Sequence, residues 1–301
     1  MIELKNEKLA VPVVLFAGIL WSFGPLVVRH MDQPNLVPWQ YIFGRGLTIF
    51  VILNLYLYFQ EGIKFYKNYL HLGISGAIGG TGLGIAMITF IYSITNTSAA
   101  ITLLCLAAMP FFTALLGFLF LRERISINVW IAIIVATIGI IIIAVGNSGK
   151  ASLIGFIFGI TSSIGFSIFS VSLRWRKETP KFTTVAFSGL FCFIIASIFI
   201  IINDQPFFAS SYNGALFSLH GVLVCLGLIL YSIGSRAIPA AELTLLSLTE
   251  VIGGIFWVWL PLFGINEIPS SNTIIGGFFL FLSITYYSLI MRTNRRFIAL
   301  N

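Results

Sequence analysis

The chain has 301 residues, of which 58% are hydrophobic and only 9% are charged, and its mean hydropathy is +1.01. A soluble domain carries about 25% charged residues, so this composition excludes a soluble enzyme or binding domain and indicates an integral membrane protein. The formal net charge of +7 does not indicate nucleic-acid binding, because basic residues of membrane proteins gather in their cytoplasmic loops.

Apolar runs of roughly 20 residues, the length that crosses the bilayer core, recur along the whole sequence. They predict an all-α integral membrane fold with ten transmembrane helices and short connectors. The predicted spans cover residues 11–29, 37–59, 70–94, 98–121, 126–146, 152–174, 182–202, 215–235, 241–264 and 273–291. The first apolar run is long enough to remain a span, so we expect no cleavable signal peptide.

The placement of lysine and arginine predicts the orientation of these spans. With the N-terminus inside, fourteen basic residues fall in the inner loops, and the outer loops hold only Arg29 and Lys150. This asymmetry is a positive-inside signal, so we expect a multi-pass protein of the cell inner (plasma) membrane with both termini in the cytoplasm. The inner set is Lys5, Lys8, Lys64, Lys67, Arg122, Arg124, Arg174, Arg176, Lys177, Lys181, Arg236, Arg292, Arg295 and Arg296.

Two stretches of the sequence follow the same order of features. Residues 90–123 and 228–267 each run from Tyr-Ser-Ile through small residues and a Leu-rich span to an acidic residue. The two stretches therefore predict an internal repeat. The alignment pairs Tyr92-Ser93-Ile94 with Tyr231-Ser232-Ile233, and Met109-Pro110 with Glu250-Val251.

The repeat divides the chain into halves 1–147 and 148–301, with five predicted spans in each. Because five is odd, the second half must enter the membrane from the opposite side, which makes the repeats inverted. Inverted repeats place a substrate site near the bilayer midplane, where the halves meet.

Three segments carry a resemblance to a known family: GILWSFGPLVVRH (18–30), PWQYIFGRGL (38–47) and AMPFFTALLGFLFLRERISINVWIAIIVATIGIIIIAVG (108–146). They resemble the first, second, and fourth and fifth helices of the EamA-type ten-helix members of the drug/metabolite transporter superfamily, with Arg45 at the arginine position of the second. The resemblance covers essentially the whole chain and implies a transporter.

One departure from the family pattern concerns the ninth span. The second repeat of the family usually reads Leu-Glu-Pro, whereas Thr249-Glu250-Val251 has no proline. Pro261 and a stretch about three residues longer precede Glu267 instead. We therefore expect this helix to kink nearer its outer end.

Glu250 is a carboxylate inside an otherwise apolar span. It lies nine residues after Ala241, roughly 14 Å into the membrane, and shares a helical face with Ser247, Gly253, Gly254 and Trp257. A bare carboxylate at that depth costs a few kcal/mol at least, so it is protonated, paired or hydrated. Two functional roles are open for Glu250. It is a ligand for a cation or ammonium group, or it is a proton-coupling residue, since desolvation favours the protonated form. The structural alternative is a helix-packing group. The i+7 position makes Trp257 a candidate neighbour of the substrate.

Arg45 is the one basic residue well inside a predicted span. It would hold a substrate carboxylate bidentately, or it has a structural role, because the second helix is peripheral in the resembled family. If Arg45 and Glu250 share a cavity, they suit a zwitterion such as an amino acid.

The segment WSFGP (21–25) predicts a kink in the first span, because Pro25 donates no backbone hydrogen bond and Gly24 tolerates distortion. The freed backbone next to Trp21 and Ser22 would face the substrate, or the helix is simply bent for packing.

Hydroxyl and aromatic side chains supply further candidates. Ser163, Ser167 and Ser170 follow helical spacing and line a wet path or bond to their own backbone. Tyr92 and Tyr231 occupy equivalent repeat positions, as gate residues or as anchors at the membrane interface.

Two further patterns favour structure over substrate binding. Gly76, Gly80 and Gly84 recur at every fourth residue and predict a close helix contact. Arg122-Glu123-Arg124 predicts a surface charge cluster at the cytoplasmic end.

No arrangement of nucleophile, base and orienting acid is present, and the three cysteines lack metal-ligand spacing. We expect no enzyme, no catalytic residue, no metal and no cofactor.

The leading hypothesis is a secondary active transporter, an exporter or exchanger of a small polar or amphipathic metabolite such as an amino acid or amine, working by alternating access. Its partners would be the substrate, the lipid bilayer and protons, but not nucleic acid, and it would be a monomer or a homodimer.

Three alternatives to this hypothesis stay open. An organic-phosphate or nucleotide-sugar antiporter is disfavoured because phosphate demands several cations. A membrane-embedded lipid-modifying enzyme would need a catalytic cluster near an interface, and a scaffold or receptor would carry no flux.

Overall fold

The computed structural model describes residues 6–123, 125–147, 153–176, 178–265, 268 and 270–298. Within these ranges every regular element is a helix, and no strand is present. The residues named above that lie outside them are Lys5, Arg124, Lys150, Lys177 and Glu267.

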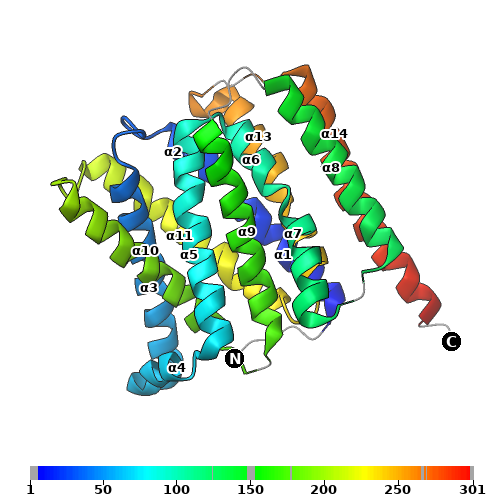
Figure 1. Ribbon diagram of the computed structural model, residues 1–301, viewed down its shortest axis with the longest axis horizontal. Helices are drawn as coiled ribbons and strands as arrows, with labels where there is room; N and C mark the ends of the chain where they lie inside the picture. The colour runs from blue at the N-terminus through cyan, green and yellow to red at the C-terminus, as the bar shows by residue number, and fades with distance from the viewer. Residues whose placement is uncertain are drawn as a thin grey trace.

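The helices run up and down in one bundle (Figure 1). In chain order they are α1 (Glu7–Trp21), α2 (Gly24–Arg29), α3 (Pro38–Glu61), η1 (Gly62–Tyr66), α4 (Lys67–Leu70), α5 (Gly73–Asn96), α6 (Ala99–Leu106), α7 (Met109–Leu116), η2 (Gly117–Leu121), α8 (Ile127–Asn147), α9 (Leu153–Trp175), α10 (Lys181–Ile202), α11 (Ser211–Gly234), α12 (Ala240–Ser247), α13 (Thr249–Trp259), η4 (Pro261–Phe263) and α14 (Ser271–Ile298).

The described residues contain 8 helical stretches that are long and apolar enough to cross a membrane. The predicted spans at 126–146 and 273–291 are helices α8 and α14, whose shorter apolar parts are Ile127–Ile142 and Ile274–Tyr287. The all-helical membrane fold is therefore confirmed, and the count of ten spans stays a prediction.

Two helices break where proline follows. α1 ends at Trp21 and α2 begins at Gly24, with Pro25 in its first turn, so the kink predicted from WSFGP is confirmed. α6 ends at Leu106 and α7 begins at Met109, again with a proline in the first turn. Proline in the first turn of a helix lacks only a donor that has no intrahelical partner there.

The third break lies at Leu248, between α12 and α13. This break lies mid-span without a proline, and the expected break nearer the outer end is also present, at Leu260. The Ser247 hydroxyl donates to the Thr244 carbonyl at 2.7 Å, and the Thr249 hydroxyl donates to the Leu246 carbonyl at 3.2 Å. Such bonds from Ser and Thr to the preceding turn bend helices. Pro261 instead begins the 3-10 turn η4 after α13 has ended.

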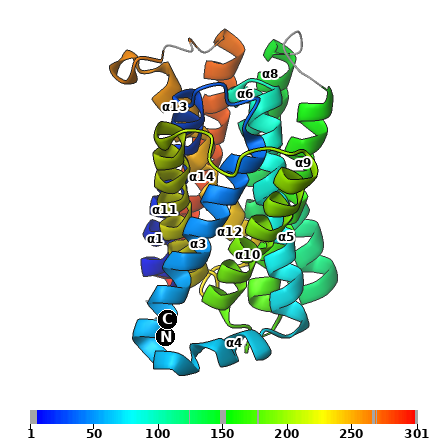
Figure 2. The same cartoon turned by 90° about the vertical axis from the view of Figure 1, so that its left-hand side faces the viewer.

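Helices of the first and second halves pack against each other in pairs. α5 packs along α9, α3 along α10, and α1 along α11, and the pair α8 and α14 stands at one side of the bundle (Figures 1 and 2). α5 and α9 approach closely where Gly82 faces Gly165. A Cβ atom on Gly165 would lie 2.5 Å from the Gly82 carbonyl oxygen, so a larger residue would not fit there. The predicted glycine stripe also makes close contacts, since a Cβ on Gly80 or Gly84 would meet phenylalanine rings of α10 within 2.6 Å.

At one end of the bundle an ion pair joins the two halves of the chain. Arg174 Nε donates to Glu123 Oε1 at 2.6 Å, and the Ala240 amide donates to Glu123 Oε2 at 3.1 Å. Arg174 Nη1 also donates to the carbonyl oxygens of Ser235 and Ile238. The prediction that Glu123 belongs to a surface cluster is therefore wrong, because its side chain is only 20% exposed and joins three segments.

We predict that Gly165→Ala destabilises the protein by about 1–3 kcal/mol, since the added methyl group overlaps the Gly82 carbonyl in a tightly packed contact. Thermal unfolding of the purified protein in detergent measures this change. Gly277→Ala in α14 is the matched control, because a Cβ there meets nothing within 4 Å, and it should raise stability by about 0.5–1 kcal/mol. Equal melting temperatures for the two variants would contradict the contact.

Candidate functional site

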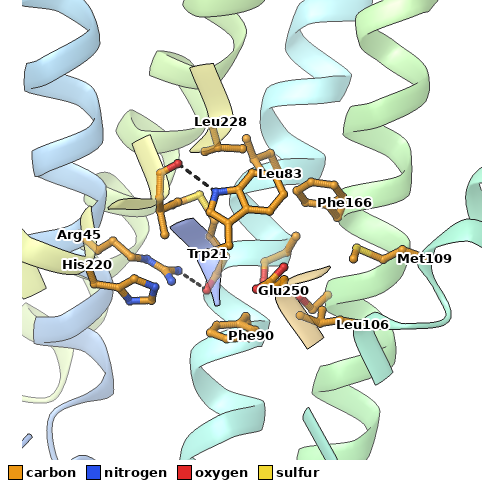
Figure 3. Close-up of a pocket in the computed structure, with 14 residues that line it drawn as sticks. Trp21, Arg45, Leu83, Phe90, Leu106, Met109, Phe166, His220, Leu228 and Glu250 are labelled. Atoms are coloured by element: carbon orange, nitrogen blue, oxygen red, sulfur yellow. Dashed lines mark hydrogen bonds between the residues drawn. The ribbon is translucent and has the colours of Figure 1, made fainter. Parts of the chain in front are cut away.

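A cavity lies at mid-height of the bundle, between α1, α3, α5, α9, α11 and α13 (Figure 3). It encloses about 70 Å³ that water-sized molecules can occupy, and one water needs roughly 10–15 Å³ by this measure. The cavity is therefore large enough for a few waters. The described residues that line it are Trp21, Arg45, Leu83, Ala86, Met87, Phe90, Leu106, Met109, Ser162, Phe166, His220, Val224, Leu228 and Glu250.

The three broken helices all end at this cavity. Trp21 is the last residue of α1, Leu106 is the last of α6, Met109 is the first of α7, and Glu250 lies in the first turn of α13. Helix interruptions are tolerated at membrane depth where the backbone lines a cavity. The N-terminus of α13 also favours a negative charge, which Glu250 supplies.

Glu250 is buried, and its carboxylate points into the cavity (Figure 3). Among the described residues no hydrogen bond or ion pair to this carboxylate is found, and the positive charge that interacts with it is Arg45. Glu250 and Arg45 therefore lie in one cavity, with space between them. A packing carboxylate would instead bond directly to a neighbouring helix.

Arg45 is 2% exposed and reaches from α3 to α5. Its Nη2 donates to the Met87 carbonyl oxygen at 2.6 Å, and its Cζ lies 5.7 Å from the centre of the Tyr41 ring. Its Nε is buried and has no hydrogen-bond partner among the described residues. One edge of the guanidinium is thus fixed by backbone, and its Nε is a buried donor without an acceptor among the described residues.

His220 is a cavity residue that the sequence analysis did not select. It extends from α11, and a hydrogen bond joins its Nδ1 to the Tyr41 hydroxyl. Its Nε2 faces Gly24 at the start of α2, since a Cβ there would lie 2.8 Å away. Its place inside the apolar span 215–235 is the sequence pattern that could have indicated a role for this histidine in the site.

Trp21 forms an aromatic wall of the cavity. Its Nε1 donates to the Val224 carbonyl oxygen at 3.2 Å, which fixes the indole against α11. Its ring centre lies 5.5 Å from those of Phe166 and Tyr231. The apolar face of the indole is therefore held in place toward the cavity.

Ser22 and Trp257 contact each other and are not among the lining residues. Trp257 Nε1 donates to Ser22 Oγ at 2.8 Å, and Ser22 Oγ donates to the Ile19 carbonyl at 2.6 Å. Phe23 stacks on the Trp257 ring with centres 4.6 Å apart. These contacts attach the break between α1 and α2 to α13.

Ser163 and Ser167 donate to backbone carbonyls and are not among the lining residues. Ser163 Oγ donates to the Cys105 carbonyl, and Ser167 Oγ donates to those of Met109 at 3.2 Å and Ser163 at 2.8 Å. The two hydroxyls therefore attach α9 to both sides of the break between α6 and α7.

The paired tyrosines lie in different surroundings. Tyr231 is fully buried behind Trp21, and its hydroxyl is 2.7 Å from Ser170 Oγ. Tyr92 is half-buried near the end of α5, with its ring centre 5.1 Å from that of Trp39. Neither tyrosine lines the cavity.

The comparisons with known proteins indicate a transporter. Residues 8–145, somewhat less than half of the chain, match the EamA-like transporter family. This match confirms the resemblance described above for the first half of the chain.

Relatives named as transporters extend the similarity along the chain. An uncharacterized transporter of Helicobacter pylori (strain J99) is 25% identical over 259 residues, which are 82% of this chain and 84% of that one. The pseudopaline exporter CntI of Pseudomonas aeruginosa (strain PAO1) is 26% identical over 194 residues, 64% of this chain and 66% of that one.

A solved structure has the same fold as this chain. Its TM-score is 0.74, and the match covers 95% of this chain and 98% of the other at 16% identity.

Within the described residues of the chain, no group of three or more His, Cys, Asp or Glu side chains could hold a metal ion.

We predict that Tyr231→Phe lowers the free energy of unfolding by about 1 kcal/mol, because it removes the hydrogen bond to the buried Ser170. Tyr92→Phe is the matched control, since no hydrogen bond of the Tyr92 hydroxyl is found among the described residues, and it should change stability by less than about 0.5 kcal/mol. Thermal unfolding of both purified variants measures the difference, and an equal loss in both would contradict this arrangement.

Proposed function

We propose that this chain is an EamA-like transporter that moves an amino acid or a related amine across the membrane. The observation that carries the proposal is the pair of opposite charges, Glu250 and Arg45, buried in one cavity without a direct ion pair. Buried charges are stable only when paired or hydrated. A zwitterion between them would neutralise both.

Each charge has a part of the substrate to bind. The carboxylate of Glu250 would accept hydrogen bonds from an ammonium group. The guanidinium of Arg45, which lines the cavity, would donate to a substrate carboxylate while its Nη2 stays on the Met87 carbonyl. The remaining walls are mainly apolar and include Trp21 and Phe166, so they suit an apolar side chain.

The size of the cavity supports transport by alternating access. Ligand pockets usually measure roughly 300–1,000 Å³, so a cavity of about 70 Å³ must widen before it accepts an amino acid. Such a change would open the site to one side of the membrane at a time.

The packing of the helices supports two inverted repeats over 1–147 and 148–301. α5 packs on α9 as α11 packs on α1, and the corresponding helices α3 and α10 pair, as do α8 and α14. Met109 begins α7 and Thr249 begins α13, close to the positions that the repeat alignment pairs. On this proposal there are ten spans, and the site lies where the halves meet.

Energy would come from a proton gradient or from exchange. Glu250 is the proton-coupling candidate, because a carboxyl without a direct partner in a cavity is favoured in its neutral form when the substrate amine is absent. The excess of lysine and arginine in the inner loops supports cytoplasmic termini in the inner membrane. The relative named as an exporter supports outward transport.

Two alternatives lose support from the same cavity. An organic phosphate needs several cations, and the described lining holds Arg45 with the single imidazole of His220. A lipid-modifying enzyme needs a nucleophile next to a base, whereas the described lining has Ser162 bonded to the Ala86 carbonyl. The proposed transporter would act as a monomer or a homodimer.

We predict that amino acids or amines raise the melting temperature of the wild type and not of Glu250→Gln. A ligand at 100 times its Kd adds about 2.7 kcal/mol of stability, so thermal unfolding across a panel of amino acids, amines and organic acids detects it. Glu178→Gln, on an exposed loop, is the matched control and should behave as wild type. If Glu250→Gln is folded and shifts as the wild type does, the carboxylate does not bind the substrate.

We predict saturable counterflow of the stabilising ligand in proteoliposomes, with proton movement in the opposite direction reported by an internal pH dye. Glu250→Gln should lose proton-driven uptake by about 10- to 100-fold, the effect of removing one charge-assisted hydrogen bond. Saturable exchange without proton movement would refute proton coupling and leave transport standing. Flux without saturation or counterflow would indicate a channel instead.

A further inference from the structure

The connection between α3 and α5 is a folded segment bounded by two glycines. Gly62 and Gly73 both have φ of +63°, a conformation that glycine adopts without strain. Between them the chain forms η1 and α4, and α4 crosses the foot of the bundle (Figures 1 and 2). The hydropathy of residues 38–70 is that of one long span, but the turn at Gly62 ends the transmembrane part.

One face of this segment is attached to the bundle. Phe65 and Tyr69 pack against the core, and the Tyr69 hydroxyl donates to Asn54 Oδ1 of α3 at 2.9 Å. Asn68 Nδ2 donates to Glu61 Oε2 at 2.7 Å. These contacts fix the orientation of the segment, so the direction of its other face is set by the fold.

The opposite face is apolar and exposed. Ile63, Tyr66 and Leu70 follow helical spacing and are 74%, 51% and 76% exposed. Lys64 and Lys67 are exposed beside them, and Glu61, the one acidic residue between Phe59 and Gly73, is bonded by Asn68. An apolar face flanked by lysines is the pattern of a helix that lies in a membrane surface.

The position of the segment fixes its depth in the membrane. α3 has 24 residues, about 36 Å at 1.5 Å per residue, which exceeds the roughly 30 Å of the hydrocarbon core. Lipid-exposed turns do not occur inside that core. The turn at Gly62 therefore lies at the membrane surface, where Ile63, Tyr66 and Leu70 can enter the lipid and the lysines can meet head groups.

We propose that η1 and α4 bind anionic phospholipid, with Ile63, Tyr66 and Leu70 inserted among the chains and Lys64 and Lys67 on the head groups. Each basic residue near an anionic surface contributes about a fivefold preference. The segment joins α3, which carries Arg45, to α5, which carries the carbonyl acceptor of Arg45. Bound lipid thus holds the two helices that meet at the cavity.

Fluorescence quenching by brominated lipid tests the proposal. Tyr66→Trp is reconstituted into vesicles of equal parts phosphatidylcholine and phosphatidylglycerol, with the bromine on one or the other lipid. The signal of the six native tryptophans is subtracted with unsubstituted protein in the same vesicles. The added tryptophan should be quenched more by brominated phosphatidylglycerol than by brominated phosphatidylcholine, and less so at high salt.

Two double variants, each of which removes two positive charges, identify the residues responsible for the preference for anionic lipid. In the Tyr66→Trp background, Lys64→Gln with Lys67→Gln should lower the preference by about fivefold per charge. Arg122→Gln with Arg176→Gln removes two exposed charges outside the segment and should leave the preference intact. Equal loss in both pairs, or no quenching by either lipid, would overturn the proposal.

A second tryptophan position guards against a folding defect. Leu70→Trp places the reporter on the same exposed face, and size-exclusion chromatography establishes that each variant is folded. If both lipids quench this reporter equally, the segment is only an apolar membrane anchor. The proposal that it binds anionic lipid would then be wrong. The readout is contact with lipid and not flux, so it is independent of the proposed substrate.

Discussion

The structure depends on holding an acidic and a basic side chain in one cavity of an apolar bundle without a direct contact between them. A direct ion pair between Glu250 and Arg45 would be the simplest arrangement at this depth. Instead Arg45 is held on the Met87 carbonyl, and Glu250 sits at the start of α13 on a different wall. Arg45 bonds to the unbroken helix α5, whereas the break before α13 puts Glu250 at a helix N-terminus, whose dipole favours a carboxylate.

The polar members of the site could be predicted from sequence because the background is so apolar. Glu250 and Arg45 stand out in spans with few other charges, and Gly24-Pro25 indicates the break that brings Trp21 to the cavity. The walls could not be predicted. In a chain with 58% hydrophobic residues, nothing in the sequence distinguishes Phe166 from a phenylalanine that faces lipid.

Side-chain direction explains other differences between sequence and structure. Ser22 and Trp257 lie within a few residues of cavity positions, but they satisfy each other. The break at Leu248 had no sequence signal of the usual kind, since it depends on hydroxyl bonds of Ser247 and Thr249 rather than on proline. A tertiary contact decides the first case, and hydroxyl bonds to the preceding turn decide the second.

The ion pair at one end of the bundle has a consequence for the proposed alternating access. Glu123 binds the Arg174 side chain with one oxygen and the Ala240 amide with the other, and Arg174 also holds two carbonyls beyond α11. Loosening any one of these contacts leaves a half-buried charge short of a partner, which raises the energy before water arrives to replace it. On the proposed alternating access, opening this end would break these contacts together.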